Sequence, residues 1–71
     1  MNVIEAAKTA LRTGRQFTYT DNYRFEISKD GQTLNRLDWL TATDGSQYFF
    51  LSDDNYPLTV DELMRDDWKM V

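Results

Sequence analysis

Apolar residues at the start of the chain recur at the spacing of a helix. The positions that share one face are Val3, Ile4, Ala7, Ala10 and Leu11. Asn2 stands where an N-cap belongs, and Glu5 follows three residues later, as in a capping box. Gly14 stands where a C-terminal cap glycine belongs. The pattern predicts a helix over about residues 3–13.

After this segment, apolar and polar residues alternate, which is typical of half-buried strands. Phe17 and Tyr19 share one face of a first strand, at 15–20. A second strand, at 22–28, carries three apolar residues on one face: Tyr23, Phe25 and Ile27. Residues 20–22 are the predicted turn between these two strands.

Two Asp-Gly pairs, at 30–31 and 44–45, are strong signals for hairpin turns. They lie on either side of a third strand, at 33–41, and the second pair precedes a fourth strand, at 47–51. In the third strand Leu34 and Leu37 are out of phase, which predicts a β-bulge there.

Both faces of the fourth strand are apolar. Tyr48 and Phe50 point one way, and Phe49 and Leu51 point the other. A strand of this kind has something packed on both faces. We expect Phe49 and Leu51 to face the helix. The opposite face then meets a partner, a ligand or a second subunit, unless the sheet curls over to cover it.

The last fifth of the chain begins with a helix start. Thr59 is a predicted N-cap, and Glu62 is its reciprocal partner in a capping box. Leu58 and Leu63 are spaced as a hydrophobic staple. A helical turn this short is not stable alone, so we expect packing through Leu63 and Met64 to hold it in place.

The end of the chain returns to alternation, with Trp68 and Met70 on one side. This pattern predicts a last strand that rejoins the sheet and places Trp68 in the core. Together the elements predict a single small α+β domain over residues 1–71. It has an N-terminal helix packed on an antiparallel sheet of four to five strands, with a short helical turn before the last strand.

Composition limits how such a domain is stabilised. The chain has 71 residues, no Cys and no His. Disulfides and the usual zinc ligands are therefore absent, which leaves assembly into a homo-oligomer as the remaining support for a domain this small. The sequence has neither an apolar run long enough to cross a membrane nor a secretory signal. We expect a cytoplasmic location and no membrane partner.

Charge is unevenly distributed along the chain. The formal net charge is −4, and residues 44–67 alone carry seven acidic residues against one basic residue. Binding to nucleic acid depends on cationic contacts to phosphates, so we expect no direct nucleic-acid binding. The acidic region is instead a candidate surface for a protein partner.

No constellation of residues indicates catalysis. The serines have no histidine partner, and there is neither a nucleophile elbow nor a glycine loop for phosphate. The paired carboxylates are adjacent in sequence and fit caps and turns better than a catalytic pair. We therefore expect no enzyme activity, no catalytic residues, no metal site and no cofactor.

Aromatic and arginine side chains are the candidates for binding. Aromatic rings could stack on a nucleobase, and a guanidinium could hold a phosphate. The alternative role for the same rings is core packing, which we expect for Trp39. The candidate partner- or ligand-binding residues are Tyr19, Tyr23, Arg24, Arg36, Trp39, Tyr48 and Phe50.

The two ends of the chain resemble a family of small phage and prophage proteins. At the N-terminal end the matching residues are Glu5, Ala6, Leu11 and Gly14. At the C-terminal end they are Glu62, Leu63, Met64, Asp67, Trp68 and Val71. The middle of the chain departs from the family pattern: the basic residue and tryptophan that often follow the first strand are replaced by "TYTDNYRF".

This resemblance implies a small antiparallel sheet with a helix packed on it. Some members are Thoeris anti-defence proteins, which sequester a signal of the cyclic ADP-ribose type as oligomeric sponges. No ligand-binding residue transfers to this chain. If the chain is phage-encoded, it would act in the cytoplasm of the host cell.

Three functions follow as expectations. The first is a phage-type accessory protein that neutralises a host defence by binding a host protein, through its aromatic sheet face or its acidic region. The second is an oligomeric sponge that sequesters a small nucleotide signal between subunits, with Arg24 and Arg36 as the cations. The third is a small structural or housekeeping phage protein.

Overall fold

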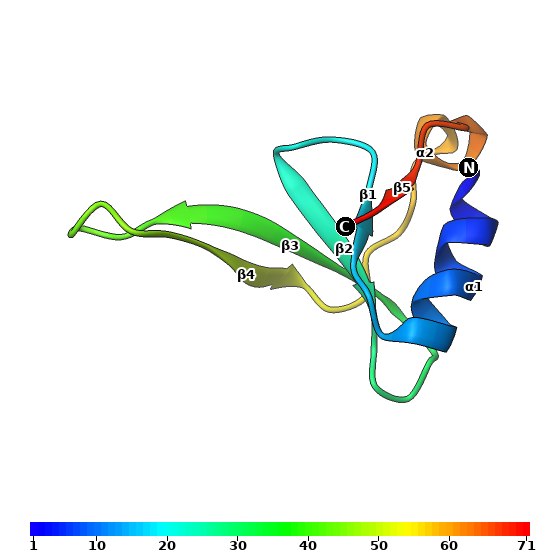
Figure 1. Ribbon diagram of the computed structural model, residues 1–71, viewed down its shortest axis with the longest axis horizontal. Coiled ribbons are helices and arrows are strands. Elements are labelled where there is room, and N and C mark those ends of the chain that lie inside the picture. Colours follow the sequence, from blue (N-terminus) through cyan, green and yellow to red (C-terminus); the bar gives the residue numbers. More distant parts are fainter.

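A computed structural model describes all of residues 1–71. Its elements, in chain order, are α1 (Val3–Thr13), β1 (Phe17–Thr18), β2 (Tyr23–Ile27), β3 (Leu34–Thr41), β4 (Gln47–Asp53), α2 (Val60–Met64) and β5 (Lys69–Met70). The strands form one antiparallel sheet in the order β4-β3-β2-β1-β5, and α1 lies against its β1–β2 part (Figure 1). The predicted α+β fold is confirmed.

Both predicted caps of α1 are present. The Asn2 side chain accepts a hydrogen bond of 2.9 Å from the backbone N–H of Glu5. Gly14 adopts the left-handed conformation, with φ of 72°, and its N–H donates to the carbonyl oxygen of Ala10. A residue with a Cβ is strained in that conformation, so a glycine at this position ends the helix at low cost.

The buried face of α1 is narrower than the sequence predicts. Val3, Ala6 and Ala10 are buried, whereas Ile4 and Leu11 are exposed. At about 100° per residue, Ile4 and Leu11 lie roughly 100° or more around the helix axis from the centre of the buried stripe. The prediction was wrong for these two residues because small alanines, not the large aliphatic residues, meet the sheet.

Aromatic rings form most of the core. Phe17, Phe25 and Trp68 are the largest fully buried side chains. The ring centroid of Trp68 lies 5.7 Å from that of Phe17 and 5.2 Å from that of Phe25. The backbone N–H of Trp68 also donates to the carbonyl oxygen of Met1. The expected core position of Trp68 is confirmed, and the two ends of the chain lie side by side.

The irregularity predicted in the third strand is in the β3–β4 ladder, but its extra residue belongs to β4. Arg36 is opposite Asp53 and Leu37 is opposite Leu51, so Ser52 is the additional residue. The Ser52 hydroxyl donates to the carbonyl oxygen of Arg36 at 3.1 Å. Leu34 and Leu37 are out of phase for a different reason: Leu34 packs on the core, and Leu37 is buried on the other face of the sheet.

The register shows which side chains share a face. Arg24 is opposite Leu37, and Leu37 is opposite Leu51. Trp39 lies two residues along from Leu37 and is opposite Phe49. These residues therefore lie on the face of the sheet away from α1, which we call the open face.

The expectation that Phe49 and Leu51 face the helix was therefore wrong. Tyr48 and Phe50 are the β4 residues on the helix side, but they lie beyond the reach of α1. Strand alternation shows that two faces exist, but it does not show which one the helix covers.

The capping box of α2 is confirmed, and its packing differs from the prediction. The Thr59 hydroxyl accepts from the N–H of Glu62, and the Glu62 carboxylate accepts from the N–H of Thr59. Leu63 and Met64 are 52% and 80% exposed, so the prediction that they hold the helix was wrong. Glu62 is only 2% exposed and is the residue that α2 buries.

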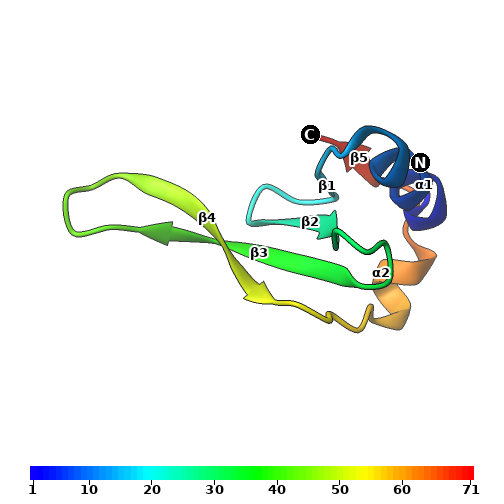
Figure 2. The same cartoon turned by 90° about the horizontal axis from the view of Figure 1, so that it is seen from below.

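The outer parts of β3 and β4 project from the body of the protein as a two-stranded hairpin (Figures 1 and 2). β2 begins at Tyr23, opposite Asp38, and from Trp39 onward β3 pairs only with β4. We call residues 39–51 the arm; its two innermost residues, Phe50 and Leu51, are opposite Asp38 and Leu37, which also pair with β2. The arm accounts for the long dimension of the molecule, which measures 37 × 25 × 20 Å. No helix is both long and apolar enough to cross a membrane.

Candidate functional site

The seven predicted binding residues do not form a single site. The structure divides them among three places on the sheet. Tyr19, Tyr23 and Arg36 lie on the helix side, beside α2 or the segment that leads to it. Arg24 and Trp39 lie on the open face, where both contact Phe49. Tyr48 and Phe50 lie on the arm and are exposed.

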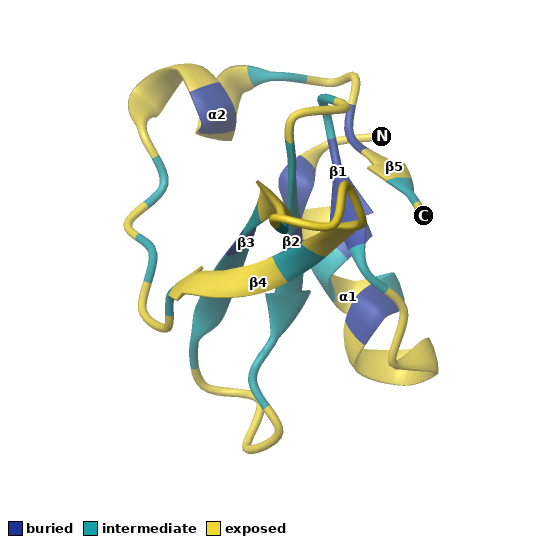
Figure 3. Cartoon of the chain, turned by 90° about the vertical axis from the view of Figure 1, so that its left-hand side faces the viewer, coloured by how far each residue is buried: buried dark blue, intermediate teal, exposed yellow.

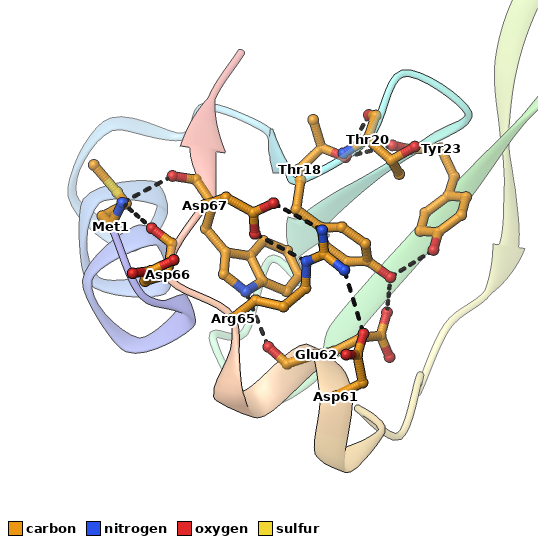
Figure 4. A network of polar contacts seen from close by, with 11 residues as sticks. Met1, Thr18, Thr20, Tyr23, Asp61, Glu62, Arg65, Asp66 and Asp67 are labelled. Atoms are coloured by element: carbon orange, nitrogen blue, oxygen red, sulfur yellow. Dashed lines mark hydrogen bonds and ion pairs between the residues drawn. The ribbon is translucent and has the colours of Figure 1, made fainter.

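A network of hydroxyl groups around Glu62 occupies the first place (Figure 4). Tyr19 donates to Oε2 of Glu62 at 2.7 Å, and Tyr56 donates to Oε1 at 3.0 Å. The hydroxyl groups of Tyr19 and Tyr23 are 2.5 Å apart. Because Tyr19 gives its proton to the carboxylate, Tyr23 is the donor in that pair. These bonds connect the β1–β2 hairpin to α2.

Burial opposes the ionisation of Glu62, but its hydrogen-bond donors outweigh that effect. The backbone N–H of Thr59 and the hydroxyls of Tyr19 and Tyr56 hold the pKa of Glu62 below its usual value. Burial, followed by the bonds to Tyr23 and Glu62, raises the pKa of Tyr19 far above its usual value. Glu62 is therefore a charged structural acceptor, and Tyr19 is a permanent donor.

Arg36 is already engaged by its neighbours. Its guanidinium lies 4.0 Å from the ring centroid of Tyr23 and forms an ion pair of 3.0 Å with Asp38. A cation that is paired and stacked in this way has less to offer an incoming phosphate. Tyr19, Tyr23 and Arg36 thus stabilise the fold at this point.

The open face has a shallow hollow of about 390 Å³. Arg24, Trp39 and Phe49 line it, together with Thr18 of β1 and Lys69 of β5. The ring centroids of Trp39 and Phe49 lie 4.0 Å apart, with an angle of 33° between the ring planes. The guanidinium carbon of Arg24 lies 4.3 Å from the ring centroid of Phe49. The hollow therefore has an aromatic wall and a cation on that wall.

Unlike Arg36, Arg24 has no carboxylate partner. It donates to the amide oxygen of Gln16 at 3.3 Å and forms no ion pair. Lys69, on the other side of the hollow, lies 3.9 Å from a carboxylate oxygen of Asp21. The hollow can therefore accept a small anionic group at Arg24, beside rings that can stack on a planar ligand.

The arm presents large apolar side chains to solvent on both of its faces. Leu40, Tyr48 and Phe50 are on the helix side, and Trp39 and Leu51 are on the open face; all five are exposed. Trp39, at 44% exposure, is not a core residue, so the expectation of core packing was wrong for it. Its indole N–H donates to the carbonyl oxygen of Asp21 at 3.0 Å, which fixes the ring over the hollow.

Figure 3 shows how little of the molecule is buried, and the whole of β4 is coloured as exposed or intermediate. The buried residues belong to α1, β1, β2, β3, α2 and Trp68. Burial is therefore concentrated where α1 and α2 meet the sheet, and the arm has no cover of its own.

No protein-family model, curated protein or solved structure matches this chain. The candidate sites consequently depend on geometry alone. Among them are no groups of three His, Cys, Asp or Glu residues that could hold a metal ion.

Sequence reasoning missed two members of these sites. Phe49 was assigned to the helix side, although it forms the wall of the open-face hollow. Aligning the strands on either side of the turn at 44–45 would have placed it opposite Trp39. Glu62 was recognised only as a capping residue, because no local signal shows that two tyrosines, one of them 43 residues away, donate to it.

Proposed function

We propose that this protein acts by binding a protein partner through its arm, without catalysis. One observation supports this proposal most strongly: the arm leaves the body of the protein with large apolar side chains exposed on both faces. Exposed apolar surface that is gathered in one place is typical of interaction sites, whereas single exposed apolar residues need no explanation.

The physics of a hairpin supports the same proposal. A two-stranded hairpin is only marginally stable in water, and a third strand or a packed surface is needed to order it. The outer arm has neither within its own chain. Burying a side chain such as Phe50 or Leu51 against a partner is worth about 1.5–3 kcal/mol, so binding both stabilises the arm and supplies affinity.

The resemblance of the chain ends suggests a biological setting. In that setting, the chain is a phage-type accessory protein in the host cytoplasm that neutralises a host defence by binding a host protein. The acidic region at 44–67 includes both ends of β4. It would favour a partner whose surface is basic.

A capture experiment with matched variants tests this proposal. The arm variant is Tyr48→Thr with Phe50→Thr, because threonine keeps the strand preference and removes the rings. The control is Ile4→Ser with Leu11→Ser, which removes two exposed apolar residues from α1 instead. We expect the parent and the control to retain the same host protein from lysate and the arm variant to lose it. Equal retention by all three proteins would contradict the proposal.

The open-face hollow supports a second candidate function, the capture of a small nucleotide signal. An unpaired guanidinium beside two aromatic rings is the combination that a planar anionic ligand requires. Native mass spectrometry of the protein purified from host cells would reveal a co-purified nucleotide and the oligomeric state together. Arg24→Gln should remove the bound mass, and retention of that mass would exclude this site.

A further inference from the structure

We propose that the outer edge of β4 docks an extended segment of a partner protein as an added strand, and that this segment is apolar in its centre and carries Lys or Arg at both ends. The inference rests on the proposed function of the arm and adds to it the mode of binding and the chemistry of the partner. Three features of β4 carry it: an unpaired edge, two apolar faces and acidic ends.

The first feature is the unpaired edge. β4 is the terminal strand of the sheet, so one side of its backbone from Gln47 to Asp53 has no partner strand. The opposite edge is formed by β5, which spans only Lys69–Met70. A long free edge offers a row of N–H and C=O groups to any extended chain, as in peptide recognition by strand addition.

Such edges are usually protected against pairing by lysines, prolines, inward-pointing charges or bulges. The segment Gln47–Leu51 contains no charged residue and no proline. The bulge at Ser52 lies at the inner end, and the register is regular from Leu51 to Gln47. These five residues are thus an unprotected pairing surface.

The second feature is the pair of apolar faces. A strand added at this edge would lie beside Tyr48 and Phe50 on one face and beside Phe49 and Leu51 on the other. Cross-strand pairs of aromatic and β-branched residues are among the most favourable in antiparallel sheets. The central part of the partner segment is therefore apolar on both faces.

The third feature is the charge at the two ends of the edge. Asp44 precedes β4, and Asp53 and Asp54 stand at its other end, with no basic residue between them. Opposite charges across a strand pair stabilise it, and like charges destabilise it. A segment with Lys or Arg at both ends matches this edge.

The same charges disfavour a second copy of the chain. The antiparallel self-pairing that uses all of Gln47–Leu51 is centred on Phe49. That register places Asp54 of one copy opposite Asp44 of the other, at each end of the pair. Two acidic regions would also face one another. A basic-ended segment of a different protein is therefore the favoured occupant.

Selection from a displayed library of random nonapeptides tests the proposal with the full-length protein as bait. We expect enriched peptides to have Lys or Arg near both ends and β-branched or aromatic residues between them. The triple variant Asp44→Asn, Asp53→Asn and Asp54→Asn keeps the side-chain oxygens that cap the local turns. It should bind the enriched peptides about fivefold to tenfold more weakly at low salt. Absence of enrichment, or enrichment of acidic-ended peptides, would overturn the proposal.

N-methylation of an enriched peptide tests the strand pairing itself. Only alternate amides of an added strand point toward the edge, so methyl groups on one alternate set should abolish binding and those on the other set should spare it. Equal tolerance of both sets would overturn edge pairing.

The proposed function would still stand if Tyr48→Thr with Phe50→Thr abolished binding of the same peptide. A stable dimer of the free protein by sedimentation that Leu51→Lys converts to monomer would assign the edge to a second copy and overturn the proposed occupant.

Discussion

Tyr19 and Glu62 are 43 residues apart in the chain, yet the hydroxyl of Tyr19 donates a hydrogen bond of 2.7 Å to the Glu62 carboxylate. This bond ties the first hairpin to α2. It also explains how a five-residue helix with exposed Leu63 and Met64 is held in place. The helix is anchored through a charge, not through its apolar side chains.

Removing this charge should destabilise the fold. In Glu62→Ala, the hydroxyls of Tyr19 and Tyr56 and the N–H of Thr59 all lose their acceptor. Unsatisfied buried donors cost about 1–3 kcal/mol each where water cannot reach them, so we expect a loss of about 3 kcal/mol in a urea titration.

Asp61→Ala is the matched control, because Asp61 is an exposed residue of the same helix that pairs only with Arg65. Its loss should be less than about 1 kcal/mol. Similar losses from the two substitutions would show that the network around Glu62 does not hold α2.

The capping box at Thr59 and Glu62 illustrates how far local sequence signals extend. The signal for the start of α2 is contained in four residues, and it was predictable for that reason. The burial of Glu62 depends on Tyr19 and Tyr56, whose approach is a consequence of tertiary packing. Local patterns therefore located the helix correctly and assigned its packing to the wrong side chains.

The same distinction applies to the sheet. The turns at Gly31 and Gly45 and the alternation on either side of them predicted the strands and their antiparallel pairing. Alternation also predicted that β4 has two apolar faces. It did not predict that the β3–β4 hairpin extends beyond β2, because the reach of a strand past its neighbours depends on register across the whole sheet.

Acid should weaken the fold in part through Glu62. Its pKa is lower in the folded protein than in the unfolded chain, so the unfolded chain binds more protons as the pH falls. The stabilisation is complete above the unfolded pKa of about 4.3 and is lost as the pH falls through the lower folded pKa. Thermal melts between neutral pH and about pH 3 would measure this loss.

Glu62→Gln separates this contribution from that of the other carboxylates. Glutamine does not titrate, so the fall in melting temperature below the glutamate pKa should be shallower than in the parent. It should not vanish, because the pKa values of Asp30, Asp44 and Asp67 are also lowered. Parallel pH profiles for the parent and the variant would contradict the assignment.

The two tryptophans should differ sharply in their importance for stability. Trp68 is 2% exposed and packs on Phe17, Tyr19 and Phe25, so Trp68→Ala should cost about 3–5 kcal/mol. That is most of the stability of a domain this small, and the variant should lack a cooperative melt. Trp39→Ala removes a half-exposed ring from the arm and should cost about 1 kcal/mol or less. Loss of the cooperative melt in Trp39→Ala would show that the arm is part of the core.

The turn at the tip of the arm offers a way to loosen the arm without disturbing the core. Gly45 has φ of +88°, and no atom lies near the position that a Cβ would occupy. The cost of Gly45→Ala therefore comes from backbone strain alone, about 1 kcal/mol. Because the outer arm is paired only with itself, this strain should favour local opening of the arm over global unfolding.

We expect amide hydrogen exchange in residues 39–49 to rise about fivefold while exchange in α1 and β2 is unchanged. Gly45→Asn, which tolerates the left-handed conformation better, should show a smaller increase. A uniform rise across the arm, α1 and β2 would mean that the arm and the core open as one unit.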